Sequence, residues 1–148
     1  MNFSQITEDL FVGTTPEVED YQPLFDLGVR LIINMRFDKG PAPNPFDLPL
    51  EFLWLRTIDS PFFPIPIRKL TEGAQAALET IRSGGKVLAH CAYGRHRGPA
   101  MGAAVLIAQG HAPEAAMELI KRQRKVADPQ AFYIRGRILR FAKQWRGM

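Results

Sequence analysis

The sequence predicts an α/β fold in which a mostly parallel central sheet is flanked by helices. Short apolar segments with the length and composition of buried strands alternate with longer segments of helical periodicity. The expected strands cover residues 10–13, 29–35, 52–55 and 86–90. Because helical segments separate most of them, the strands are expected to run parallel, with helices on both faces of the sheet.

Five helices are expected between and after these strands. Thr15 and Pro16 can cap and begin the first helix, and Gly28 can end it. The others are expected over residues 68–83, from Pro99 onward, over 113–125 and around 134–145, where apolar residues recur at three- and four-residue steps. Basic residues occupy the other side of the last helix, as a solvated face or as a surface that steers anions or contacts an acidic membrane.

Composition limits the class of protein. With 148 residues, 46% of them hydrophobic, the chain is expected to be a single domain over 1–148, and we expect a monomer. No apolar run approaches the roughly 20 residues that span a bilayer, and no basic-then-apolar leader opens the sequence. A lone cysteine cannot form an internal disulfide, so we expect a cytoplasmic protein in a reducing compartment.

A seven-residue segment, 91–97, connects the expected strand 86–90 to the helix from Pro99. Cys91 opens this segment and Arg97 closes it. The residues between them are enough for the backbone to curl with successive N–H groups pointing inward, which makes a nest for a tetrahedral oxyanion at a helix N-terminus. The expected phosphate-binding residues are Ala92, Tyr93, Gly94, Arg95, His96 and Arg97.

Cys91 and Arg97 suit complementary chemical roles. The helix N-terminus, the loop amides and the Arg97 guanidinium all favour a thiolate, whereas an ordinary thiol is only about 3% ionised at pH 7. The planar fork of Arg97 can hold two phosphate oxygens at once, and Gly94 allows the tight turn. The alternative for an isolated cysteine is a buried, inert thiol.

These residues carry a family resemblance. His90 through Arg97 resembles the HCxxGxxR signature of cysteine-dependent phosphatases, and the chain resembles small dual-specificity phosphatases over nearly its whole length. Residues 6–13, Leu24, 27–29 and 31–35 are similar to the family's first strand, first helix and second strand. The resemblance implies a protein tyrosine or dual-specificity phosphatase that forms a cysteinyl-phosphate, and we expect no metal or other cofactor.

Asp59 is the expected proton donor to the leaving oxygen. It follows the strand 52–55 and lies 32 residues before Cys91, a spacing that resembles the one between general acid and cysteine in compact dual-specificity phosphatases. Alternatively, Asp59 only begins a turn with Ser60 and Pro61. Asp38 and Asp47 are rival donors.

Two supporting residues are expected near the site, each with an alternative. His90 either packs as a satisfied core histidine or orients the loop through its ring. Arg36 either lies on the surface or lines the pocket and holds a second phosphate. Cys91, Asp59 and Arg36 all follow strands, and ligands in open parallel sheets lie beyond the carboxyl ends of strands. The long connection 37–50 is expected to form a pocket wall, and segment 62–66 either forms another wall or anchors to the core.

Gly98 departs from the family pattern, which usually has a serine or threonine after the arginine. The resemblance implies that this hydroxyl assists breakdown of the phosphoenzyme, although the phosphatases of regenerating liver also lack it. One hydrogen bond to a charged group is worth about 1.5 to 3 kcal/mol. A bond made only in the transition state would therefore change the rate about 10- to 100-fold.

The preferred substrate is a phosphorylated protein, but other phosphomonoesters stay open. Gly94 through Arg97 resembles the GKHR loop of plant and fungal atypical phosphatases, which handles inositol pyrophosphates, so an inositol phosphate or phosphoinositide is the alternative. A 5′-phosphatase acting on RNA is a weaker alternative, and no nucleic-acid partner is expected, because no aromatic and basic single-strand platform is evident. Gly98 also supports an alternative from another class of protein, a phosphate-binding module with negligible turnover. Sulfur transfer by a cysteine loop is less favoured, because Asp59 and Arg97 would have no role in it.

Overall fold

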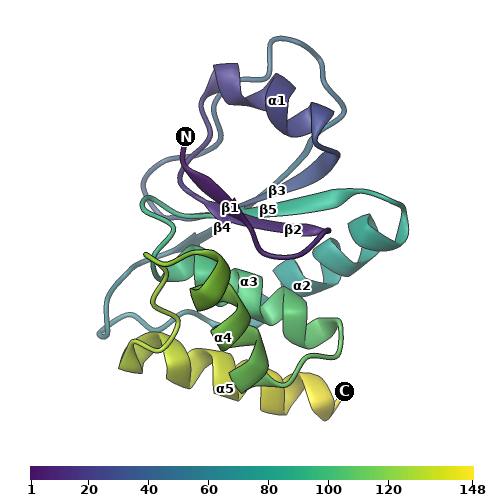
Figure 1. The fold of residues 1–148 in the computed structure, drawn as a ribbon. Helices are drawn as coiled ribbons and strands as arrows, with labels where there is room; N and C mark the ends of the chain where they lie inside the picture. The colour runs from purple at the N-terminus through teal and green to yellow at the C-terminus, as the bar shows by residue number, and fades with distance from the viewer.

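Five strands form one sheet in the order β1-β2-β5-β3-β4 in the computed structural model, which describes residues 1–148. The strands are β1 (Phe3–Gln5), β2 (Leu10–Gly13), β3 (Val29–Arg36), β4 (Glu51–Thr57) and β5 (Lys86–His90). The four strands from β2 to β4 pair in parallel, and β1 pairs antiparallel with β2 at one edge. Strand β5 therefore lies between β2 and β3 as the central strand of the sheet (Figure 1).

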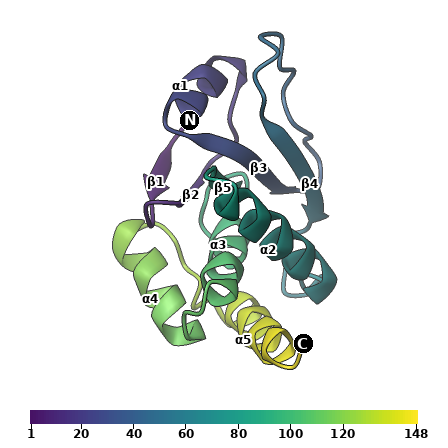
Figure 2. The same ribbon diagram turned by 90° about the vertical axis from the view of Figure 1, so that its right-hand side faces the viewer.

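The helices divide unequally between the two faces of the sheet. On one face lies α1 (Tyr21–Asp26), which follows a single 3₁₀ turn over Val18–Asp20. The other face carries α2 (Ile67–Arg82), α3 (Arg97–Ala108), α4 (Pro113–Gln123) and α5 (Phe132–Arg146), as Figure 1 shows. In the turned view of Figure 2, α3 lies between α4 and the pair α2 and α5. The helical layer thus surrounds the helix that begins at the cysteine loop.

Two hydrophobic cores follow from this division. The larger core joins 30 buried residues between the sheet and α2 to α5, and the smaller joins six between the sheet and α1. Side chains of β3 point alternately to the two faces of the sheet and so contribute to both cores. Leu31, Ile33 and Met35 belong to the larger core, and Ile32 belongs to the smaller. A sheet covered on both faces needs such nearly continuous apolar strands.

Helix α3 is buried along nearly its whole length, from Gly98 to Ile107. Glycines let its neighbours approach closely. A Cβ at Gly102 would lie 2.9 Å from Val12 Cγ2, and a Cβ at Gly73 of α2 would overlap the Met101 side chain. Because packed cores tolerate little added volume, these contacts fix α3 and the loop before it against the sheet.

The α/β class with a mostly parallel sheet is confirmed, and the structure corrects several details. The edge strand β1 was not predicted from the sequence. The first helix begins at Tyr21 rather than at Thr15, because Glu17 is still extended and a 3₁₀ turn precedes the helix. No helix in the structure combines the length and apolar character that crossing a membrane requires.

Segments 37–50 and 62–66, the two expected pocket walls, differ in how far they are buried. Within segment 37–50, Ala42, Leu48 and Leu50 pack against the smaller core, so much of this connection covers the α1 face of the sheet. The side chains of Phe62 and Phe63 are 86% and 59% exposed. Only Ile65 anchors segment 62–66 in the core, so anchoring does not explain its aromatics.

Candidate active site

Three strands end at the same edge of the sheet, and each brings a predicted site residue there. Cys91 follows β5, Arg36 ends β3, and Asp59 lies two residues beyond the end of β4. Since these strands are parallel neighbours, their carboxyl ends form one edge. The structure therefore brings Cys91, Arg36 and Asp59 to one end of the molecule.

Cys91 lies at the floor of the loop, where its side chain is almost wholly buried. Its backbone N–H donates to the Gly13 carbonyl of β2 over 3.4 Å, and its carbonyl accepts from Thr15 Oγ1 over 3.3 Å. The backbone N–H groups from Ala92 to His96 donate to no acceptor in the chain. This run of unpaired donors can bind an anion.

Arg97 is held in place by the ends of two strands. Its Nη1 donates to the Thr57 carbonyl over 2.8 Å and to the Met35 carbonyl over 3.3 Å. Its Nε is buried and has no hydrogen-bond partner. One side of the guanidinium is thus fixed by neutral carbonyls, while Nε is left to bind an anion over the loop.

The carboxylate of Asp59 accepts hydrogen bonds on both oxygens. Tyr133, at the start of α5, donates to Oδ1 over 2.7 Å, and His96 Nδ1 lies 3.0 Å from Oδ2. An ionised carboxylate can only accept, so Nδ1 is the donor in that pair. Partial burial by itself raises the pKa of Asp59, but the bonds from Tyr133 and His96 outweigh it and the pKa is lowered.

Tyr133 is fixed in its donor role. Burial, and then the hydrogen bond to Asp59, raises the pKa of Tyr133 to about 12, so the phenol keeps its proton at neutral pH. Its ring lies beside His96, with the ring centroids 5.5 Å apart. Asp59, His96 and Tyr133 therefore form a connected group that joins the loop after β4, the cysteine loop and α5.

His90 and Arg36 support the loop from the sheet. Burial lowers the pKa of His90 to about 4, with the charges of Arg36 and Arg97 acting in the same direction, so the ring is neutral at pH 7. Its Nδ1 is buried and has no hydrogen-bond partner, whereas contact with the Cys91 backbone raises the pKa of the ring against the larger effect of burial. Arg36 Nη1 donates to Thr15 Oγ1 over 3.1 Å, which in turn donates to the Cys91 carbonyl.

Comparisons with known proteins agree with this geometry. No model of a known protein family matches the chain. Dual specificity phosphatase 28 of Mus musculus is 31% identical over 134 residues, which cover 86% of this chain and 76% of that protein. The chain belongs to the dual-specificity phosphatases. It is thus a cysteine-dependent phosphatase, as the resemblance of segment 90–97 implies.

Solved structures share the fold. A mouse putative dual specificity phosphatase complexed with zinc tungstate superposes with a TM-score of 0.87 at 23% identity, covering 98% of this chain and 89% of that one. PTPMT1 superposes with a TM-score of 0.84 at 26% identity, covering 99% of this chain and 97% of that one. The whole phosphatase fold is therefore present in this chain.

Gly98, where the phosphatase family usually has a hydroxyl, lies directly beside Cys91. A Cβ built there would lie 3.5 Å from Cys91 Sγ and 3.4 Å from the Cys91 nitrogen, which are ordinary van der Waals contacts. The site has room for a Cβ, so packing does not require a glycine here. Its effect on the phosphatase is chemical: no hydroxyl faces the sulfur from this position.

Arg124, which the sequence analysis did not single out, lies behind the phosphatase loop and is only 3% exposed. Its Nε donates to the Gly94 carbonyl over 2.8 Å and Nη2 donates to the Tyr93 carbonyl over 3.1 Å. Nη1 donates to Asn2 Oδ1 and Ser4 Oγ, at 2.8 and 3.1 Å. No spacing rule connects residue 124 to the loop, so sequence alone offered no signal for this contact.

Neither rival donor matches Asp59. Asp38 is 75% exposed at its side chain and its only recorded partner is Arg36, at 3.5 Å. Asp47 is exposed and has a left-handed backbone with φ of 48°, as in a turn. Asp59 is the one aspartate of the three that contacts the phosphatase loop, through His96.

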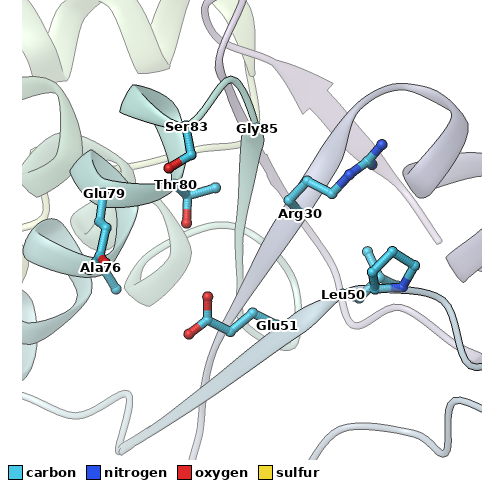
Figure 3. A pocket seen from close by; sticks show the side chains of 9 residues that line it. Arg30, Leu50, Glu51, Ala76, Glu79, Thr80, Ser83 and Gly85 are labelled. Atoms are coloured by element: carbon cyan, nitrogen blue, oxygen red, sulfur yellow. The ribbon is translucent and has the colours of Figure 1, made fainter.

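A cavity of about 540 Å³ lies at the opposite end of the sheet. Its lining includes Arg30 near the start of β3, Glu51 at the start of β4 and Gly85 just before β5, with Glu79 and Thr80 from α2 (Figure 3). These residues mark the amino ends of the strands. The cavity is therefore separate from the phosphatase loop, which lies at the carboxyl ends.

Proposed function

We propose that this phosphatase hydrolyses phosphotyrosine, and also phosphoserine and phosphothreonine, in proteins, with Cys91 as nucleophile, Arg97 as phosphate clamp and Asp59 as general acid. One observation carries the assignment. Cys91 is the only cysteine and a free thiol, and it lies under a run of backbone N–H groups that have no acceptor in the chain. A nucleophile placed under an oxyanion nest is the arrangement that phosphoryl transfer to sulfur requires.

In the first step, Cys91 Sγ attacks phosphorus in line with the leaving oxygen, so that an S–P bond forms as the P–O bond breaks. The loop amides and Arg97 Nε bind the three equatorial oxygens and stabilise their charge. Asp59 gives its proton to the leaving oxygen. The products of this step are the alcohol, a cysteinyl-phosphate and an ionised Asp59.

Asp59 is held ionised in the free enzyme, and substrate changes its surroundings. A phosphate dianion in the loop adds negative charge beside the carboxylate, which raises the pKa of a neighbouring acid. Asp59 then gains a proton on substrate binding. In the second step the ionised Asp59 takes a proton from the attacking water, which breaks the S–P bond and releases phosphate and the thiolate.

An aromatic row supports phosphotyrosine as a substrate. His96, Tyr133 and Phe132 follow one another with ring centroids 5.5 Å apart, and Phe132 is 79% exposed. Because Asp59 contacts both His96 and Tyr133, a phenyl ring leaving toward Asp59 would pack along this row. We also propose that the phosphatase acts as a monomer in the cytoplasm, where a reducing compartment keeps the lone thiol available.

A phosphoinositide is the second candidate, and Arg36 favours it. Arg36 reaches the loop through Thr15, and its buried Nε has no hydrogen-bond partner, so it can take a second phosphate. PTPMT1 in complex with PI(5)P has the same fold, with a TM-score of 0.85 at 24% identity. This candidate uses the same loop and the same nucleophile.

Hydrolysis of an aryl phosphate without added metal tests the proposal. The wild type should release phosphate with inhibition by vanadate, and Cys91→Ser should not. Equal rates for the two proteins would reject the covalent mechanism. A panel of phosphotyrosine, phosphoserine and phosphothreonine peptides beside phosphoinositides then decides the substrate: Arg36→Gln should lower kcat/KM for phosphoinositides far more than for peptides if the second candidate is right.

A further inference from the structure

The burial of the Arg124 side chain carries an energetic cost that the proposed reaction does not account for. Its guanidinium is buried, yet all its hydrogen-bond partners are neutral oxygens and no carboxylate forms a salt bridge with it. Burial lowers the pKa of Arg124, and an electrostatic contribution from Cys91 acts in the opposite direction. Burying a charge without a salt bridge is costly, so an arginine at this position requires an explanation beyond packing.

The two loop carbonyls that Arg124 binds explain the direction of the loop amides. In a trans peptide unit the C=O and the following N–H point to opposite sides. The Tyr93 and Gly94 carbonyls point at Arg124, so the N–H groups of Gly94 and Arg95 point away from it. Both of these N–H groups lack an acceptor in the chain. Arg124 thus fixes two of the donors that face the anion site.

Gly94 is required by the same contact. Its φ is +63°, and a Cβ there would lie 2.6 Å from Arg124 Nη2 and 2.8 Å from Nε. The backbone of the loop therefore lies directly on the guanidinium. On the far side, Asn2 and Ser4 around strand β1 hold Nη1, so the edge strand fixes the arginine and the arginine fixes the loop.

We propose that Arg124 is a positioning residue of the phosphate loop: its guanidinium holds the Tyr93 and Gly94 carbonyls turned away from the anion and places a fixed positive charge behind the loop. The inference rests on the proposed function, because it concerns the loop that holds the substrate phosphate. Affinity for a tetrahedral oxyanion then depends on a residue that does not touch it.

The test is calorimetric titration with tungstate, which needs no turnover and so stays informative if the wild type hydrolyses nothing. Arg124→Gln should bind tungstate about 10- to 100-fold more weakly, since it loses the charge and one of two carbonyl bonds. Arg122→Gln, the same change at an exposed residue of the last turn of α4, should bind as the wild type does. Unchanged affinity in folded Arg124→Gln overturns the proposal, even if its melting temperature falls.

Two further measurements keep the test decisive. If Arg124→Gln does not fold, Arg124→Lys takes its place, because lysine keeps the charge but cannot bind both carbonyls at once. Its affinity for tungstate should be about 3- to 10-fold lower than that of the wild type, and an unchanged affinity overturns the proposal. In the wild type we expect Cys91 to react faster with anionic iodoacetate than with neutral iodoacetamide, and this preference should be smaller in Arg124→Gln. A purely structural brace would leave that preference unchanged in the folded variant.

Discussion

Tyr133 donates a hydrogen bond to Asp59 over 2.7 Å, although 74 residues separate them in the chain. Helix α5 thus reaches across to the loop after β4 and holds the proposed general acid by one oxygen, while His96 holds the other. Both bonds stabilise the ionised form and lower the pKa of Asp59. The position of the acid and its protonation are therefore set by the same two side chains.

Tyr133→Phe should move the alkaline limb of kcat/KM to higher pH. The donor must be protonated to act, and removing a bond that favours the ionised carboxylate raises the pKa of Asp59, so the active form persists further into the alkaline range. The measurement is a pH profile with a phenyl or alkyl phosphate. Tyr21→Phe, which removes a phenol hydroxyl on the α1 face of the sheet, is the control. A limb that stays in place or moves down in Tyr133→Phe contradicts the prediction.

Asp59→Asn should lower kcat/KM mainly for substrates whose leaving group must be protonated. With a phenyl or alkyl phosphate, kcat/KM should fall about 10²- to 10⁴-fold, the usual contribution of general acid catalysis, and much less with an acidic nitrophenol. The loss should be greatest at low pH, where the wild-type carboxyl is protonated. Asp38→Asn is the matched control, and equal losses for good and poor leaving groups would remove Asp59 from the role of donor.

Gly98→Ser should speed breakdown of the cysteinyl-phosphate about 10- to 100-fold. A Cβ fits at this position and lies 3.5 Å from Cys91 Sγ, so a serine hydroxyl can reach the sulfur. In the wild type we expect a burst of released nitrophenol before steady turnover, measured by stopped flow under saturating substrate. The burst should vanish in Gly98→Ser and remain in Gly98→Ala; a wild type without a burst would show that the hydroxyl matters little.

His90 should make the fold sensitive to acid. Its pKa is about 4 in the folded protein and about 6.5 in the unfolded chain, so the unfolded chain binds the extra proton first as pH falls. Stability from the neutral ring is complete above pH 6.5 and is lost toward pH 4, by about 3 kcal/mol in total. The free energy of unfolding, measured with urea between pH 4 and 6.5, should fall as the pH falls in the wild type and in His111→Asn. In His90→Asn it should stay nearly constant.

Much of the site could be predicted from short-range residue spacing and from the positions of residues that follow parallel strands. Cys91, Gly94 and Arg97 lie within one loop, so their relation is a matter of short-range spacing, and Asp59 and Arg36 follow parallel strands whose carboxyl ends must meet. Tyr133 and Arg124 could not be found in this way. Each reaches the loop from a different helix across 30 residues or more, and an arginine at the end of an amphipathic helix is expected in solvent.

The edge strand and the first helix escaped prediction for a related reason. Strand β1 has only three residues, too few to show an alternation, and it exists because β2 offers it an edge. Thr15 has the residue type of a helix cap, but its hydroxyl is used instead by the Cys91 carbonyl and by Arg36. Tertiary contacts of the site thus override the local signal at Thr15.

The unequal cores imply that the two faces of the sheet differ in local opening. Six buried residues hold α1 and the connection after β3, whereas 30 join the sheet to α2, α3, α4 and α5. Amide protons of α1 should therefore exchange with solvent through small fluctuations, while those of α3 and β5 should exchange only when the whole molecule unfolds. Cys91 lies between β5 and α3, so the α1 face can open locally without disturbing the two elements that hold the cysteine loop.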